Sequence, residues 1–234
     1  MVCMKLKNLR LSEDFCGFEC AVFDLDGTLL DSMPMWHGVS DKYLESHGIS
    51  LRSSVWDEVK RLTETQTAVY FQEKFGIKDP IDVICAEFES IIFEEYAKKL
   101  QLKDGALDVL VRLNEMKIPC VLATATNRKC VSACLSRLKI AGLFTDVLTC
   151  LDLQTNKHEP LIFQKASEIC GASFDKTVVF EDAYHCISTA KKASFLTCAV
   201  FDESANEKCP DGKTDWEHII ALSDYAIKNW REIL

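Results

Sequence analysis

The sequence lacks the features that several classes of protein need. No apolar stretch approaches the roughly 20 residues of a membrane-spanning helix, so we expect no membrane partner. No run of Lys or Arg is interleaved with aromatic residues, and 36 acidic residues outnumber 27 basic ones to give a net charge of -9. Because this charge repels polyanions, we expect no nucleic-acid partner, although small anions remain possible.

Cysteine is abundant, but its arrangement is not typical of a disulfide or zinc framework. The chain has 12 cysteines, yet no CxxC pair occurs. The cysteines nearest to each other in sequence are four residues apart, as Cys130 and Cys134 are. The first 19 residues mix charged residues with short apolar stretches and hold no signal-peptide core. We therefore expect a cytoplasmic protein whose thiols are reduced and mostly serve as small buried hydrophobic residues. For the oligomeric state we expect a monomer or weak homodimer.

Short apolar runs rich in β-branched residues recur along the chain, with helix-like segments between the later ones. They cover residues 20–23, 120–123, 147–149, 178–180 and 196–201. Hydrophobic residues make up 48% of the sequence, enough for a sizeable core. This alternation predicts an α/β fold with a doubly wound parallel sheet.

A long interval separates the first two of these runs. It is mostly helical and too long for a single crossover, with helix ends marked by Gly48 and Gly76 and a helix start at Asp79-Pro80. We therefore predict an inserted helical cap domain at residues 33–102 and a Rossmann-like core domain formed by residues 1–32 and 103–234.

Carboxylates follow the first predicted strand directly. Asp24 and Asp26 lie where this strand ends, and Gly27 allows the backbone to turn sharply. In an open α/β sheet, ligands bind at the carboxyl ends of the strands. Paired acids at such a position suit a divalent cation better than a role in packing.

The second predicted strand ends in a hydroxyl-rich turn. Thr124 lies at its tip, and Thr126 and Asn127 lead into a helix N-terminus, where free N–H groups favour a phosphate. For Thr126 and Asn127 the alternative is ordinary helix capping, whereas Thr124 is the better candidate to face a ligand.

A later strand ends in Glu181 and Asp182 and adds carboxylates to the same edge. Acids clustered this densely must take up protons unless a cation is present, and oxygen ligands with few histidines favour Mg²⁺. Asp182 could alternatively cap the helix that follows it. Lys157 precedes another helix and could bring positive charge to a phosphate, although a single loop lysine is usually solvated.

These residues together resemble the haloacid dehalogenase-like superfamily, whose four motifs fall in this order from Asp24 to about residue 199. The helical insertion is similar to the cap of its phosphatase and β-phosphoglucomutase-like branch. The residues that carry the resemblance are Asp24, Asp26, Thr124, Lys157, Glu181 and Asp182.

The resemblance implies a two-step phosphoryl transfer on a small phosphorylated metabolite. Asp24 would attack phosphorus to form an aspartyl phosphate, and Asp26 would protonate the leaving oxygen and then activate water. Mg²⁺ would be held by Asp24, the backbone carbonyl of Asp26, and Asp182, with Glu181 nearby. Thr124 and Lys157 would bind the transferring phosphoryl oxygens.

Departures from the family pattern bear on which reaction is carried out. Sugar-phosphate mutases of this branch place an arginine for the second phosphate where this chain has Glu64, although Arg61 is close by. The absence of a positively charged side chain at this position favours a phosphatase over a phosphomutase. A non-enzymatic binding protein with the same fold is the third possibility, but every motif residue is present. Trp36 and Glu64 are the candidates for substrate specificity in the cap.

Overall fold

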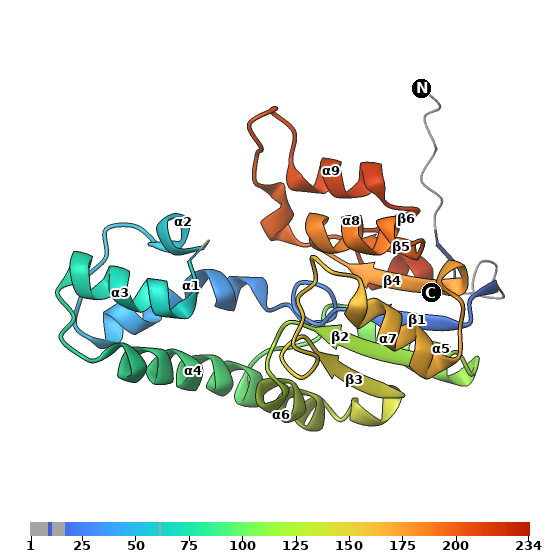
Figure 1. The fold of residues 1–234 in the computed structure, drawn as a ribbon, viewed down its shortest axis with the longest axis horizontal. Coiled ribbons are helices and arrows are strands. Elements are labelled where there is room, and N and C mark those ends of the chain that lie inside the picture. Colours follow the sequence, from blue (N-terminus) through green and yellow to red (C-terminus); the bar gives the residue numbers. More distant parts are fainter. Residues whose placement is uncertain (1–8, 11–16, 61) are drawn as a thin grey trace. The chain divides into compact units, whose positions relative to one another are not determined.

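The structure is a computed structural model that describes residues 9, 10, 17–60 and 62–234. Most of the N-terminal stretch considered above for a signal peptide, and Arg61, lie outside the described residues. The chain divides into two compact units (Figure 1): unit 1 comprises Met1–Asp31 and Gln101–Leu234, and unit 2 comprises Ser32–Leu100. Among the described helices, none has the length and apolar character needed to cross a membrane.

A parallel sheet forms the centre of unit 1. Its six strands run in the order β3-β2-β1-β4-β5-β6, and every neighbouring pair is parallel. This confirms the predicted α/β class. The strands are β1 (Cys20–Phe23), β2 (Cys120–Thr124), β3 (Asp146–Thr149), β4 (Thr177–Glu181), β5 (Leu196–Val200) and β6 (Tyr225–Ile227).

Strand β6 has no counterpart among the predicted runs. It holds only three residues and pairs with β5 at the edge of the sheet. So short a strand leaves little periodic signal in the sequence. Its apolar residues are equally consistent with a strand and with irregular chain packed against the sheet edge.

Helices of unit 1 connect the strands and cover both faces of the sheet. Cys20 and Val22 of β1 point to a core that α7 and α8 complete, whereas Phe23 stacks on Phe180 and packs against Trp230 on the other face. Both faces of β1 are therefore buried, as expected for a parallel sheet. The helices are α5 (Ala106–Glu115), α6 (Arg128–Leu138), α7 (Leu161–Cys170), α8 (Tyr184–Lys192) and α9 (Asp215–Leu222), with short 3₁₀ helices η2 (Ala141–Leu143), η3 (Phe174–Lys176), η4 (Glu203–Asn206) and η5 (Trp230–Ile233).

In the residues of unit 2 that the structure describes, all regular structure is helical (Figure 1). In the aromatic core of this unit, Tyr43, Phe71 and Phe88 pack against one another, with the Tyr43 ring centroid 5.5 Å from that of Phe71 and 4.8 Å from that of Phe88. Gly76 ends α3 with a φ of 71°, a conformation that glycine adopts at no steric cost. The helices are α1 (Met33–Ser46), α2 (Trp56–Val59), α3 (Glu64–Phe75) and α4 (Ile81–Lys98).

Candidate active site

The register of the central strands brings the predicted acids together. Phe23 at the end of β1 pairs with Phe180 of β4, and the Asp24 N–H donates to the Phe180 carbonyl at 3.0 Å. Asp24 and Glu181, which follow these paired residues, therefore leave the sheet side by side.

The turn after β1 is fixed by bonds within itself and from distant segments. Gly27 adopts a φ of 73°, and its N–H donates to the Leu30 carbonyl at 3.1 Å. Lys103 donates to the Gly27 carbonyl, and the Trp230 indole donates to the Thr28 carbonyl at 3.1 Å. The backbone that carries the two acids is therefore held in place before any ligand binds.

A carboxylate cluster lies at this edge of the sheet. Among the described residues, Asp24, Glu181 and Asp182 each offer an oxygen, and these oxygens all lie within 4.8 Å of one another. Thr28 orients Asp182 by donating to its Oδ1 at 3.2 Å. Backbone N–H groups of Asp182 and Ala183 donate to Glu181 Oε2 at 3.1 and 3.3 Å, which orients that carboxylate too.

Lys157 supplies positive charge inside the cluster. Its side chain is only 6% exposed, and its Nζ contacts Asp24 Oδ1 and lies 2.7 Å from Glu181 Oε1. Burial by itself lowers the pKa of Lys157, but the two carboxylates raise it well above its ordinary value. Lys157 is thus a buried, permanently charged lysine and not a solvated loop residue.

One lysine leaves the cluster short of positive charge. Burial, together with the charges of Glu181 and Asp26, raises the pKa of Asp24 from 3.8 to about 7, despite the opposing effect of Lys157. Burial and the neighbouring acids Glu181 and Asp24 also raise the pKa of Asp182 well above its ordinary value. A cluster of carboxylate oxygens with excess negative charge fits a hard divalent cation such as Mg²⁺.

Asp26 lies beside the turn that follows β2. Thr126 donates its hydroxyl to Asp26 Oδ2 at 2.6 Å, and the Thr126 N–H donates to Thr124 Oγ1 at 3.1 Å. The carboxylate of Asp26 is partly exposed and does not belong to the cluster formed by Asp24, Glu181 and Asp182. The side chain of Asp26 therefore lies outside the group of carboxylates that could hold a cation.

The remaining predicted residues fall into two groups. Asn127 caps α6, because its Oδ1 accepts from the Cys130 N–H at 3.0 Å. Trp36 and Glu64 lie in unit 2, where both line a cavity of about 200 Å³ together with Trp56. Burial and the charge of Glu89 raise the pKa of Glu64.

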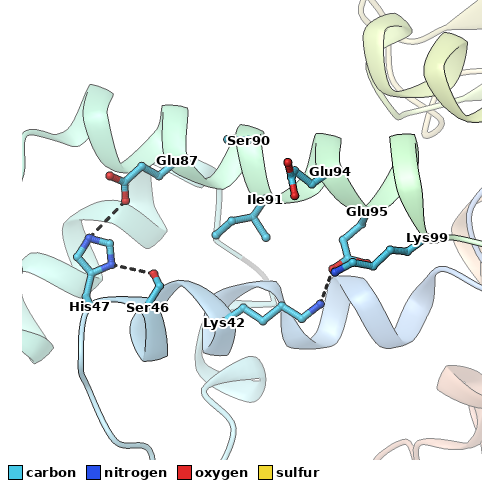
Figure 2. A pocket seen from close by; sticks show the side chains of 9 residues that line it. All are labelled: Lys42, Ser46, His47, Glu87, Ser90, Ile91, Glu94, Glu95 and Lys99. Atoms are coloured by element: carbon cyan, nitrogen blue, oxygen red, sulfur yellow. Dashed lines mark hydrogen bonds and ion pairs between the residues drawn. The ribbon is translucent and has the colours of Figure 1, made fainter.

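A second cavity of unit 2, of about 610 Å³, contains none of the predicted site residues (Figure 2). It lies between α1 and α4, and several of the charged groups that line it contact one another. Lys42 and Lys99 both bind Glu95 Oε1, at 2.7 and 3.0 Å, and His47 lies 3.3 Å from Glu87. Glu95 is thus surrounded by more positive than negative charge, in contrast to the carboxylates of unit 1.

Sequence reasoning missed the residues that hold the site in place. Lys103 binds the carbonyls of Gly27 and Phe201, the latter at 2.8 Å, and forms an ion pair of 2.8 Å with the buried Asp202. Burial raises the pKa of Asp202, but the hydrogen bond and charge of Lys103 outweigh it and lower this pKa below its ordinary value. Neither residue belongs to a motif, so no local pattern in the sequence indicated them.

Comparisons with known proteins agree with this geometry. The family model of haloacid dehalogenase-like hydrolases matches residues 21–200. A phosphorylated carbohydrates phosphatase of Thermotoga maritima is 25% identical over 179 residues, covering 75% of this chain and 81% of that protein. Hexitol phosphatase A of Escherichia coli is 28% identical over 166 residues, with coverage of 69% and 73%.

A solved structure shows the same fold across nearly the whole chain. The crystal structure of β-phosphoglucomutase from Clostridium difficile superposes with a TM-score of 0.67 at 16% identity, covering 93% of each chain. The family match spans most of the chain and includes the strand ends that carry the carboxylates and the loop that carries Lys157. The chain therefore belongs to the haloacid dehalogenase-like hydrolases.

Proposed function

We propose that this protein is a Mg²⁺-dependent phosphatase that hydrolyses a small phosphorylated metabolite, with a phosphorylated sugar or polyol as the first class to test. The observation that carries the proposal is the buried Lys157 in contact with Asp24 and Glu181, within a cluster that still has excess negative charge. Phosphoryl transfer needs positioned positive charge and a fixed nucleophile, and this cluster is suited to both.

Asp24 is the proposed nucleophile. A carboxylate must be ionised to attack phosphorus, whereas burial raises the pKa of Asp24 to about 7. The contact of Lys157 with Asp24 Oδ1 already limits this rise, so Lys157 favours the ionised form of the nucleophile and orients it. Asp24, Asp182 and Glu181 would hold Mg²⁺, which when bound supplies positive charge to the phosphoryl oxygens. The Asp26 backbone carbonyl is the further proposed ligand.

Asp26 is the proposed general acid and base. Its carboxylate is oriented by the Thr126 hydroxyl at 2.6 Å and is partly exposed, so a leaving oxygen and then water can reach it. Protonating the leaving group lets Asp24 displace it and form an aspartyl phosphate, and the Asp26 carboxylate then takes a proton from the attacking water. Thr124 and Lys157 are the proposed ligands of the phosphoryl oxygens.

Substrate selection is proposed to come from unit 2. Trp36 and Glu64 line the same cavity of about 200 Å³. An indole ring next to a carboxylate suits the apolar face and the hydroxyl groups of a polyol. The phosphatase relatives are named for phosphorylated carbohydrates and a hexitol, in agreement with this class. Glu64 also stands where mutases of the branch use an arginine, which favours hydrolysis over phosphomutase activity.

The direct test is phosphate release by the purified full chain with Mg²⁺, measured across sugar phosphates, polyol phosphates, nucleotides and phosphorylated acids. β-Glucose 1-phosphate is included, and its conversion to glucose 6-phosphate is measured separately. The proposal predicts phosphate release that Asp24→Asn abolishes. Isomerisation without phosphate release would instead establish a phosphomutase, and inactivity on the whole panel would favour a binding protein.

A further inference from the structure

A pair of thiols in unit 1 lies away from the motif residues. Cys20 begins β1 and Cys170 ends α7, and their sulfur atoms are 2.6 Å apart. Two sulfurs that are not bonded do not normally approach so closely, and a disulfide requires about 2.05 Å. Joining them therefore needs only a small movement of the side chains.

We infer that Cys20 and Cys170 form a redox modification site, at which a hydroperoxide converts the two thiols into a reversible intramolecular disulfide. This inference goes beyond the proposed phosphatase function and does not depend on it.

The surroundings of the two thiols give each a distinct role. Cys170 is partly exposed, so a peroxide can reach it, whereas Cys20 is fully buried. The hydrogen bond from Cys20 lowers the pKa of Cys170, and the same bond, with burial, raises the pKa of Cys20. The accessible thiol is thus the one that more readily becomes a nucleophilic thiolate.

The reaction balances with a hydroperoxide as the only oxidant. The Cys170 thiolate attacks the hydroperoxide, the O–O bond breaks, and a sulfenic acid forms. The hydroxide or alkoxide that departs takes up the proton that Cys170 released on ionising, and leaves as water or an alcohol. The Cys20 sulfur then attacks the Cys170 sulfur, so the S–S bond forms and the S–O bond breaks. The departing hydroxide takes the Cys20 proton and leaves as water. The two sulfurs together lose two electrons, which the hydroperoxide gains.

The bond would join two separate pieces of chain. Unit 1 consists of a segment that ends at Asp31 and a segment that begins at Gln101, and Cys20 and Cys170 lie in different segments. A disulfide between them closes a loop that includes all of unit 2, and it therefore restricts the conformations of the unfolded chain. Oxidation is therefore expected to raise the melting temperature of unit 1 by about 10–20 °C, given the length of the closed loop.

The test treats the reduced full chain with increasing hydrogen peroxide, blocks remaining thiols, and maps the peptides without reduction. Trypsin alone leaves Cys16 and Cys20 in one peptide, so cleavage after Glu19 is added to separate them. We expect a linked pair of peptides containing Cys20 and Cys170, loss of the mass of two hydrogens, and full reversal by dithiothreitol. Cys170→Ser should abolish the link, and Cys20→Ser should lead to over-oxidation of Cys170.

Cys198→Ser is the matched control, because Cys198 is another buried cysteine of the same sheet. This variant should form the same link as the wild type. Cys170 linked to Cys120 or Cys16, or Cys170 that stays alkylatable while other thiols oxidise, would overturn the inference. The wild-type peptide map decides the pairing even if a variant fails to fold, and phosphatase activity does not enter the measurement.

Discussion

Each unit holds a buried carboxylate in contact with lysine, and the two clusters differ in which charge is in excess. In unit 2, Lys42 and Lys99 meet the single buried carboxylate of Glu95 (Figure 2). In unit 1, the single buried Lys157 meets Asp24 and Glu181, with Asp182 beside them. In the first cluster the lysines outnumber the carboxylate, whereas in the second the carboxylates outnumber the lysine and further positive charge is required.

This difference separates a structural ion pair from a candidate reaction site. Burial raises the pKa of Glu95, but the hydrogen bonds of its two lysines outweigh burial and lower this pKa below its ordinary value. The pKa of Asp24 instead rises to about 7, chiefly through burial. Strongly perturbed acids that share a buried cluster are typical of functional sites.

Replacing the nucleophile should give the largest loss. We expect Asp24→Asn to lower kcat/KM by about 10⁴-fold or more, because an amide cannot form the phosphorylated intermediate. Phosphate release from the best substrate measures the effect. Glu95→Gln, which changes the carboxylate of unit 2 in the same way, is the matched control and should keep wild-type kcat. Comparable losses in both variants would contradict the assignment.

A smaller loss is expected from Asp26→Asn, about 10²–10⁴-fold in kcat for substrates with a poor leaving group. Para-nitrophenyl phosphate, whose leaving group needs no proton, should be affected less. The ratio of the two losses is the measurement. Equal losses on both substrates would contradict a role in protonating the leaving oxygen.

Most of the sheet could be predicted from sequence because its buried strands are short runs of apolar residues between clear helix signals. Strand β6 could not, since three residues at a sheet edge carry almost no pattern. The acids at the ends of β1 and β4 could be recognised as well, because they directly terminate these apolar runs. Lys103 and Trp230 could not, because contacts made across the folded chain with the Gly27–Thr28 backbone leave no local signature.

The burial of Lys157 also required the structure. As a single loop residue it is indistinguishable in sequence from a solvated lysine, and only the folded chain shows it in contact with Asp24. Asn127 presents the opposite case. Its sequence position fitted both a ligand and a helix cap, and the structure shows it capping α6.

Mg²⁺ should stabilise the protein through the cluster of unit 1. At saturation about 100-fold above its dissociation constant, we expect the melting temperature to rise by about 5–10 °C. Asp182→Asn should lose this response, and Glu95→Gln should retain it. A Tm increase in Asp182→Asn equal to that of the wild type would place the cation elsewhere.

Breaking the cluster of unit 2 should affect stability alone. Glu95→Gln leaves Lys42 and Lys99 facing a neutral group, so we expect a loss of about 1–3 kcal/mol in the free energy of unfolding. Urea denaturation checks this value. Unchanged stability would show that the ion pairs of Glu95 contribute nothing, and a fall in kcat would show that unit 2 charges enter the chemistry.

The two clusters should also give the Mg²⁺-free protein opposite pH dependences. Because the pKa of Asp24 is raised from 3.8 to about 7, its folded form binds a proton that the unfolded chain releases, and stability falls as pH rises through this window. Because the pKa of Glu95 is lowered from 4.5, its contribution is present above that pH and is lost as pH falls through the lowered pKa. The melting temperatures of Asp24→Asn and Glu95→Gln, compared with wild type across pH 3 to 8, separate the two contributions. If the curves of melting temperature against pH for both variants run parallel to that of the wild type, both contributions are refuted.

Trapping the phosphorylated enzyme tests the central claim most directly. The full chain is mixed with Mg²⁺ and its best substrate, quenched in acid within the first turnover, and digested for mass spectrometry. The account predicts the added mass of one phosphoryl group on Asp24, formed and lost at rates that match turnover, and none in Asp24→Asn. Turnover without phosphate on Asp24, together with full activity of Asp24→Asn, would contradict it.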